Sequence, residues 1–413
     1  MKNHLLCLGA VLLSMQADAL SLDAKLQRVI DTFQLKAVSC RVNEQLIDPQ
    51  LIPIGEIIFN SPVLSGDKDT SCSTCHIDRL ALTDGLPVSV GVGGQGESVD
   101  RVYSDGIVVP RNSFTLFGRA HKDYKIFFWN GVIQETNGRI ISPVGEGYQL
   151  GYKSPLAVAA TMPILARDEF LGRLKPFDEN LNLRQINKAY YSDKLTAANN
   201  VIQQIIESDI SNEADKLRTA MQKAGLSSLD LPTIGNALAA FIAKKVSLCE
   251  QSQWEKYIEG EQEAITEEQK EGALVFYGKG RCAACHNGPF FSDFQFHSIG
   301  VPQGEYGPYI HHQDIGRADV TFKAIDRFKF RTPPLIKVAE TGPYGHNGEY
   351  KSLEDIVLFH ANPIPYFVKR GWTSDEELLG YGKMLSARSP LLGYIEISGD
   401  NELRALIAFL ETL

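Results

Sequence analysis

The sequence of 413 residues has no run of basic residues and few stretches with the pattern of a β-strand. Lysine and arginine number 41 against 50 aspartates and glutamates, which gives a formal net charge of −9. Without a basic stripe, nucleic acid is not an expected partner. No segment after the N-terminus reaches the roughly 18 apolar residues that a membrane-spanning helix needs, so no membrane span is expected. The scarcity of strand signals favours a mainly α fold.

The one long apolar segment stands at the N-terminus. A lysine at position 2 precedes an apolar run over residues 5–15, and an A-x-A cleavage pattern follows at residues 17–19. This order is typical of a secretory signal peptide, and the apolar run is too short to span a membrane as a helix. We therefore expect residues 1–19 to be removed and the mature protein to be exported to the periplasm.

The rest of the chain divides into two halves that repeat one order of events. Each half runs from a helical pattern to a pair of cysteines, then through long loops to another helix. Loops as long as those between residues 83 and 155 usually have a function or wrap around something. Because 413 residues suffice for two full cores, we expect two related domains, residues 20–250 and 251–413.

Each half carries one C-x-x-C-H motif. The two motifs are Cys72-Ser73-Thr74-Cys75-His76 and Cys282-Ala283-Ala284-Cys285-His286. Two thiols three residues apart can each add to a vinyl group of one porphyrin, and the next residue then offers an imidazole to the iron. A redox pair, a disulfide or a zinc site is the alternative, but a zinc site would need both pairs, which stand 210 residues apart. The motifs predict two covalently bound c-type haems, one in each of two cytochrome c-like domains.

Two further cysteines remain in the mature chain. Cys40 and Cys249 either form a disulfide, which an oxidising compartment allows, or stay as free buried thiols. Neither arrangement gives them a role in the chemistry.

A capped helix is predicted to start near Leu353. Ser352, with an aspartate three positions on, forms a capping box that starts the helix. Leu353, Ile356 and Val357 then form one apolar face of this helix. His360 completes that face, where it is either a hydrogen-bonded core residue or an iron ligand. The two haem motifs elsewhere in the chain favour the ligand.

Four other stretches, together with the C-x-x-C-H motifs, carry a resemblance to a known family. They are "LTDGLPVSVG" at 82–91, "PRNSFTLF" at 110–117, "FFWNG" at 127–131 and "FRTPPLIKVAETGPYGHNG" at 330–348. From about residue 50 to the end, the chain resembles the bacterial di-haem cytochrome c peroxidase and MauG superfamily. The resemblance implies that hydrogen peroxide reacts at the N-terminal haem while the C-terminal haem stores or relays electrons.

The resemblance also assigns roles to single residues. It implies that His76 and His286 bind the two irons and that Trp129 conducts electrons between the haems. It places the distal acid at Glu169, six residues after a proline. A carboxylate suits that role, because cleavage of the peroxide O–O bond needs a group that moves a proton from one oxygen to the other. Glu146, in a similar string, is a competing candidate that fits the spacing less well.

A calcium ion is a further implication of the resemblance. Its ligands would be Asn112, Thr341 and Pro343, the last two through main-chain carbonyls, an oxygen set that suits calcium. His346, in the motif before the capped helix, is implied to be a pocket or interface residue and not a ligand.

Two departures from the Met-ligated peroxidases of the family bear on function. Those enzymes carry a loop histidine that blocks the peroxidatic iron, and Val92 stands at its position here. The family's second ligand to the C-terminal haem, methionine or in MauG tyrosine, lies 74 residues beyond the haem histidine, which is His360 in this chain. An imidazole ligand lowers the reduction potential relative to a thioether. We therefore expect an open first haem and a bis-histidine second haem.

These departures favour a MauG-like enzyme that uses peroxide to oxidise a partner protein or another donor. One alternative is a cytochrome c peroxidase that removes peroxide with electrons from small cytochromes or cupredoxins. A second is a di-haem electron-transfer or sensor protein without turnover, although a pure carrier gains nothing from an open coordination position. We expect a monomer or a homodimer.

Overall fold

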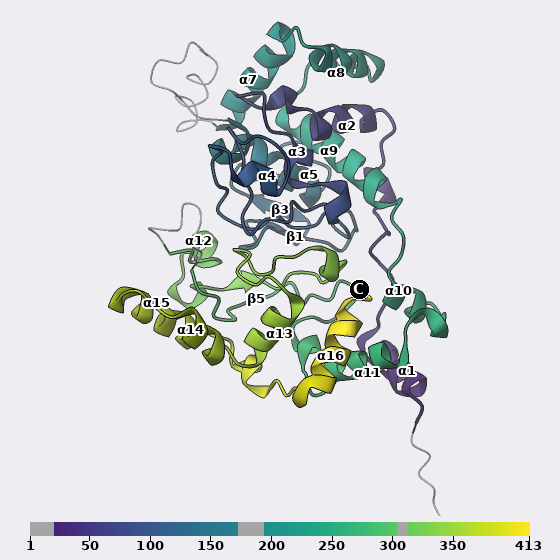
Figure 1. Cartoon of the computed structure of the whole chain (residues 1–413). Helices are drawn as coiled ribbons and strands as arrows, with labels where there is room; N and C mark the ends of the chain where they lie inside the picture. The colour runs from purple at the N-terminus through teal and green to yellow at the C-terminus, as the bar shows by residue number, and fades with distance from the viewer. Residues whose placement is uncertain (1–19, 172–193, 304–312) are drawn as a thin grey trace, which may run out of the picture.

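A computed structural model describes residues 20–171, 194–303 and 313–413. The fold is mainly helical, as predicted, and it forms two lobes that face each other across an interface rich in loops (Figure 1). Within these ranges, every helix is too short or too polar to cross a bilayer. The predicted signal peptide, residues 1–19, lies outside the described residues.

The first lobe contains the described α-helices between residues 52 and 246. They are α2 (Ile52–Asn60), α3 (Cys72–Cys75), α4 (Val99–Val102), α5 (Pro155–Thr161), α7 (Lys194–Ser208), α8 (Asn212–Lys223) and α9 (Leu231–Val246). An antiparallel meander of four short strands lies on the side that faces the second lobe: β1 (Ile126–Phe127), β2 (Ile133–Thr136), β3 (Arg139–Ser142) and β4 (Gly145–Glu146). The predicted long loops thus include a small sheet.

The second lobe contains the C-terminal helices and a two-stranded sheet. Its elements are α10 (Gln253–Ile258), α11 (Glu267–Tyr277), α12 (Ala318–Thr321), α13 (Leu353–Ala361), α14 (Ile364–Arg370), α15 (Asp375–Ser386), α16 (Gly399–Leu410), β5 (Phe296–His297) and β6 (Phe330–Arg331). A capping box at Ser352 starts α13, as the sequence predicts, and a second capping box at Thr266 starts α11.

A close helix crossing forms the centre of each lobe. In the first, a Cβ atom on Gly55 of α2 would lie 2.0 Å from the carbonyl oxygen of Ala237 on α9. In the second, a Cβ atom on Gly272 of α11 would lie 1.8 Å from the carbonyl oxygen of Ala405 on α16. Only glycine allows backbones to approach this closely. The shared device agrees with two halves of related design.

The helix nearest the N-terminus does not pack where the predicted domain boundary places it. Helix α1 (Leu22–Phe33) lies beside α11 in the second lobe (Figure 1), and Leu26 is fully buried in that lobe's core together with Trp254. The predicted first domain began at residue 20, whereas packing in the first lobe begins near Val38. The reason is that the apolar face of α1 is covered by the C-terminal core.

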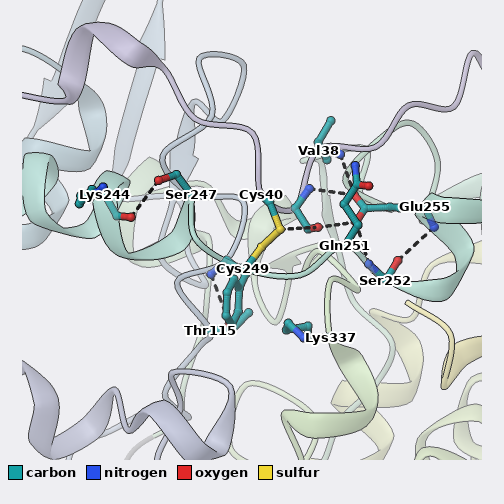
Figure 2. Close-up of a disulfide and its surroundings, with 12 residues drawn as sticks. Val38, Cys40, Thr115, Lys244, Ser247, Cys249, Gln251, Ser252, Glu255 and Lys337 are labelled. Atoms are coloured by element: carbon teal, nitrogen blue, oxygen red, sulfur yellow. Dashed lines mark hydrogen bonds between the residues drawn. A yellow bond between two sulfur atoms is a disulfide. The ribbon is translucent and has the colours of Figure 1, made fainter. Parts of the chain in front are cut away.

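A disulfide ties the two chain segments that cross between the lobes. Cys40 and Cys249 are bonded, with their Cα atoms 5.4 Å apart (Figure 2). Next to them, the carboxylate of Glu255 accepts hydrogen bonds from the main-chain N–H groups of Val38 and Ser39, at 2.7 and 2.8 Å. This settles the alternative that the sequence left open in favour of the disulfide.

Replacing both cysteines by serine (Cys40→Ser with Cys249→Ser) should lower the free energy of unfolding by about 2–4 kcal/mol, because the cross-link restricts the unfolded chain. Urea unfolding followed by far-ultraviolet circular dichroism measures the change. The wild type in a thiol reductant is the control and should unfold at the same urea concentration as the double variant. Equal stability of the oxidised wild type and the double variant would contradict the prediction.

Candidate functional site

Two cavities among the described residues contain the C-x-x-C-H motifs, and the larger of these two lies in the second lobe, against the lobe interface. It has a volume of about 240 Å³, and its wall includes the three functional residues of the second motif and the histidine at the end of α13: Cys282, Cys285, His286 and His360. The two thiols and the two imidazoles that the sequence singled out thus meet around one space.

Both imidazoles in this cavity are held by main-chain carbonyls. The Nδ1–H group of His286 donates to the carbonyl oxygen of Phe291 at 2.9 Å, and that of His360 donates to the carbonyl oxygen of Ile356 at 2.7 Å. Burial, with the nearby charge of His360 adding to it, lowers the pKa of His286 to about 4. A neutral imidazole bonded through Nδ1 keeps the lone pair of Nε2 for a metal.

Helix α13 presents its predicted apolar face to the cavity. Leu353, Ile356, Val357 and His360 all line the space. The side chain of Phe359, by contrast, is buried in protein core. The face that would suit a solid core therefore borders a cavity of the second lobe.

The smaller cavity, of about 90 Å³, lies in the first lobe. Cys72, Cys75 and His76 line it together with Glu169. The Nδ1–H group of His76 donates to the carbonyl oxygen of Leu82 at 2.8 Å, and burial lowers the pKa of His76 to about 4. The first motif and the predicted distal acid share this space.

The carbonyls that hold the two motif histidines belong to residues in an unusual backbone conformation. Leu82 has a φ of 60° and Phe291 has a φ of 53°. Residues other than glycine, asparagine and aspartate rarely adopt this left-handed backbone conformation. Such strain persists where the surrounding fold enforces it, commonly at functional sites. In each lobe the chain after the C-x-x-C-H motif bends sharply to return a carbonyl to the histidine.

Glu169 lies in a single π-helical turn (Arg167–Leu171), a type of turn that is frequent at functional sites. Burial, with the charge of Asp168 adding to it, raises the pKa of Glu169 to about 7. A carboxyl group with this pKa can both accept and return a proton near neutral pH.

The loop at Val92, where the family's blocking histidine would stand, packs directly on this turn. The main-chain N–H of Val92 donates to the carbonyl oxygen of Asp168 at 3.0 Å, and the Val92 side chain is fully buried. A Cβ atom on Gly91 would lie 1.9 Å from the same carbonyl oxygen, so glycine is required for this approach. The loop therefore supports the turn that carries Glu169.

A buried arginine fixes this loop in turn. The Arg101 side chain donates from Nε to the carbonyl oxygen of Val90 at 2.6 Å and from Nη2 to that of Gly91 at 2.8 Å. Its Nη2 also lies 3.2 Å from the hydroxyl of Thr70, which lines the smaller cavity. One guanidinium group thus joins the loop to the segment that leads into the first cysteine pair.

Glu146, the competing candidate for the distal acid, stabilises the backbone instead. Its carboxylate accepts hydrogen bonds from the main-chain N–H groups of Ile140 and Gln149, both at 2.8 Å. These bonds tie the turn that follows β4 to strand β3, and Glu146 does not line either cavity. The geometry favours Glu169.

A wall of aromatic and basic side chains separates the two cavities. Phe114 and Arg119 line both of them, Phe128 lines the smaller one and Trp129 the larger one. The indole Nε1–H of Trp129 donates to the carbonyl oxygen of Asn112 at 3.0 Å. Trp129 is therefore held in the wall of the larger cavity, next in sequence to Phe128 in the wall of the smaller one.

The three predicted calcium ligands lie at the same interface. Asn112, Thr341 and Pro343 all line the larger cavity. The main-chain N–H of Asn112 donates to the carbonyl oxygen of His346 at 2.8 Å, and the His346 ring stacks on Phe330 with ring centres 3.6 Å apart. His346 thus occupies an interface position, and calcium binding stays a prediction.

Several residues of the larger cavity received no role from the sequence. Arg119, Arg281 and Arg331 contribute guanidinium groups to its wall, and no carboxylate is found among its described lining residues. His297 also lines it, with Nε2 2.8 Å from a carboxylate oxygen of Asp293. An apolar space with cationic groups at its wall fits a haem, whose two propionates need positive partners.

Two covalent c-type haems fit these cavities in donor set, and the arginines of the larger cavity also fit the charge of the propionates. Each cavity offers two thiols and one neutral imidazole on a C-x-x-C-H turn, and the larger one adds a second imidazole. The fold and the site define a di-haem c-type oxidoreductase.

A family model described as di-haem cytochrome c peroxidase matches residues 49–263, just over half of the chain. The chain therefore belongs to the di-haem cytochrome c peroxidase family, whose enzymes act on hydrogen peroxide and carry two haems c. This confirms the resemblance that the sequence motifs indicated.

Relatives of both predicted kinds are similar to this chain. The cytochrome c551 peroxidase of Pseudomonas aeruginosa is 26% identical over 404 residues, which cover 97% of each protein. The methylamine utilization protein MauG of Methylorubrum extorquens is also 26% identical, over 89% of this chain and 79% of its own. Sequence similarity alone does not separate the two kinds of enzyme.

Solved structures share the fold. A MauG-like protein associated with microbial copper homeostasis superposes with a TM-score of 0.60 at 22% identity, covering 90% of this chain and 92% of its own. The di-haem peroxidase BthA of Burkholderia thailandensis superposes with a TM-score of 0.58 at 19% identity, over 89% and 86% of the two chains. The architecture is thus that of MauG-like proteins.

The Glu169→Gln variant should react with hydrogen peroxide about 10²–10⁴-fold more slowly, because the amide cannot accept the peroxide proton. In the wild type the rate should rise from about pH 6 to about pH 8 as the carboxyl group with a pKa of about 7 ionises. Stopped-flow absorbance of the haem protein measures both effects.

The matched control is Glu146→Gln, which should keep the wild-type rate and pH profile because Glu146 only closes a turn. A slow Glu146→Gln enzyme beside a normal Glu169→Gln enzyme would reverse the assignment of the distal acid.

Proposed function

We propose that the protein is an exported di-haem peroxidase of the MauG-like type. Hydrogen peroxide reacts in the pocket of the first lobe, and the oxidising equivalents are shared with a bis-histidine site in the second lobe. They then oxidise a partner protein or another donor. The observation that carries this proposal is the position of His360 in the wall of the same cavity as His286.

The covalent attachment follows the two motifs. Cys72, Cys75 and His76 would hold the first haem, and the corresponding residues of the second motif would hold the other, with His360 as its second ligand. When bound, the two haem irons supply peroxide binding and the storage of oxidising equivalents. The remaining chemistry falls to the polypeptide.

Glu169 handles the protons of the reaction. Reduction of hydrogen peroxide to two water molecules takes two electrons and two protons, and cleavage of the O–O bond needs a proton on the leaving oxygen. Ionised Glu169 accepts the proton from one peroxide oxygen and returns it to the other. Its burial and its pKa of about 7 support both halves of this exchange.

The loop at Val92 keeps the first pocket accessible. No imidazole stands in this loop, since Val92 and its glycine neighbours occupy residues 91–94. The bonds from Arg101 and to Asp168 hold the loop against the turn of Glu169. We propose that peroxide reaches this pocket without prior reduction of the second site.

Trp129 is placed to conduct electrons between the sites. Its side chain lines the larger cavity, while its neighbour Phe128 lines the smaller one. The hydrogen bond from its indole to Asn112 fixes the ring in the wall. We also propose a calcium ion on the oxygens of Asn112, Thr341 and Pro343, and a periplasmic location after removal of residues 1–19.

The second candidate function is a cytochrome c peroxidase that removes peroxide with electrons from small cytochromes or cupredoxins. The match to a cytochrome c551 peroxidase over 97% of both chains favours it. His360 favours the first candidate, because a second imidazole lowers the potential of its site relative to methionine.

Hydrogen peroxide added to the fully oxidised protein should change the absorbance of both haems promptly, because the loop at Val92 leaves the first pocket open. The altered spectrum should persist in the absence of a donor. Stopped-flow absorbance with and without one equivalent of reductant makes the comparison. A protein that responds only after reduction would be a peroxidase of the second kind.

The His360→Met variant should show a higher reduction potential at one haem, since a thioether donates less to oxidised iron than an imidazole. Spectroelectrochemical titration measures the shift, and low-temperature electron paramagnetic resonance (EPR) should show a changed low-spin signal. As a control, His121→Met, at a histidine that does not line either cavity, should leave both unchanged. If the potential and the low-spin signal of the His360 variant match the wild type, His360 is not a ligand.

A further inference from the structure

A series of tyrosines leads away from the larger cavity. Tyr344 lines the cavity and forms an isolated antiparallel bridge with Tyr350. The main-chain N–H of Tyr344 donates to the carbonyl oxygen of Tyr350 at 2.7 Å, and the reverse bond measures 3.1 Å. Residues paired across such a bridge project to the same face, so the two side chains are neighbours.

The next ring in the series is Tyr366 on α14. The ring centres of Tyr350 and Tyr366 lie 5.1 Å apart. Tyr350 is almost completely buried, and its hydroxyl has no hydrogen-bond partner among the described residues. The hydroxyl of Tyr366, by contrast, donates to a carboxylate oxygen of Glu349 at 2.7 Å.

These tyrosines belong to a small apolar cluster that is also part of the cavity wall. Ile299, Val301, Tyr344 and Ile356 pack in this cluster and line the larger cavity as well. Tyr350 belongs to the same cluster. The aromatic series therefore begins at the cavity itself, with no further layer of protein between.

The series ends at an outer edge of the second lobe. Helices α14 and α15 form that edge, on the side away from α16 (Figure 1). On α14, the side chains of Ile364 and Val368 are 52% and 69% exposed. Tyr366 of the same helix is itself only partly buried, so part of its side chain is open to solvent.

We propose that Tyr366, with Glu349 as its proton acceptor, is a one-electron oxidation site that links the larger cavity to the surface of α14. The inference rests on the proposed peroxidase function, which supplies the oxidant. It identifies the donor class as a one-electron reductant that reacts at the protein surface and does not enter the cavity.

The electron and proton balance is simple. Tyr366 loses one electron toward the cavity, and its phenolic proton passes along the existing hydrogen bond to Glu349. A surface donor then returns one electron to the ring, and the proton moves back to the phenolic oxygen. Two such cycles supply the two electrons that reduce one hydrogen peroxide to two water molecules.

The hydroxyl environments decide which tyrosine holds the oxidation. An oxidised phenol is a strong acid and is stable only when it can lose its proton. Arg370 lies near both tyrosines and is ion-paired with Glu349, so the difference is the acceptor. Tyr350 has none among the described residues, whereas Tyr366 donates to Glu349. The ring of Tyr350 therefore only relays the electron, and the radical is located on Tyr366.

The test is freeze-quench EPR of the full-length haem protein after addition of hydrogen peroxide. We expect a tyrosyl radical whose hyperfine structure narrows when the protein contains ring-deuterated tyrosine. The radical should be lost in Tyr366→Phe, while the peroxide-induced haem absorbance change remains. Glu349→Gln, which keeps a similar shape but is a poor base, should also diminish the radical.

Tyr381→Phe is the matched control. The hydroxyl of Tyr381 also donates to a carboxylate, at 2.7 Å from Glu377, but its ring neighbour at 4.6 Å is Phe367 and not a tyrosine. This variant should keep the radical. A radical that survives in Tyr366→Phe, or that disappears only in Tyr381→Phe, would overturn the proposal.

A second arm separates this proposal from the proposed function. Photogenerated tris(bipyridine)ruthenium(III), a one-electron oxidant, replaces hydrogen peroxide on the same set of proteins. If the haems do not respond to peroxide but the ruthenium arm shows a radical that depends on Tyr366, only the peroxidase proposal fails. If neither arm gives a signal that depends on Tyr366, the oxidation site is wrong.

Discussion

The geometry of both cavities depends on one kind of hydrogen bond, from the Nδ1–H of a buried histidine to a main-chain carbonyl. His76, His286 and His360 all make it, to Leu82, Phe291 and Ile356 respectively. The bond selects one tautomer, fixes the ring and leaves Nε2 as the only free donor for a metal. Within α13 the carbonyl comes from the preceding helical turn. In the two motifs it requires a left-handed residue, so the fold keeps Leu82 and Phe291 in a strained conformation.

The interface between the lobes places these two fixed centres relative to each other. Arg111 of the first lobe binds Asp314 of the second with two hydrogen bonds, of 2.8 and 2.7 Å, and the Asp314 carboxylate is almost completely buried. Close by, the main-chain N–H of Arg331 donates to the carbonyl oxygen of Trp129 at 2.7 Å. A paired guanidinium and carboxylate gives a directional contact that a purely apolar interface would lack. These contacts fix the position of Trp129 relative to the second lobe.

Local sequence signals predicted the local structure well. The capping box at Ser352 located the start of α13, and the spacing of apolar residues identified the face of α13 that carries His360. Signals that depend on distant contacts were weaker. The sequence of α1 has the pattern of an ordinary amphipathic helix, which does not show where the helix packs. Helix α1 belongs to the second lobe because its apolar face packs against α11. The short strands of β1 to β4 are too brief to show a periodicity, and the bonds between them define the meander.

The sequence by itself determined the donor groups. Two C-x-x-C-H motifs carry the attachment chemistry within five consecutive residues, and the offset to His360 can be counted along the chain. Tertiary structure favours Glu169 over Glu146, because only folding places one carboxylate in the wall of a cavity and engages the other in a turn. It also decided the pairing of Cys40 with Cys249 and the basic wall of the larger cavity. Burial and proximity between distant residues arise from packing, and no local pattern encodes them.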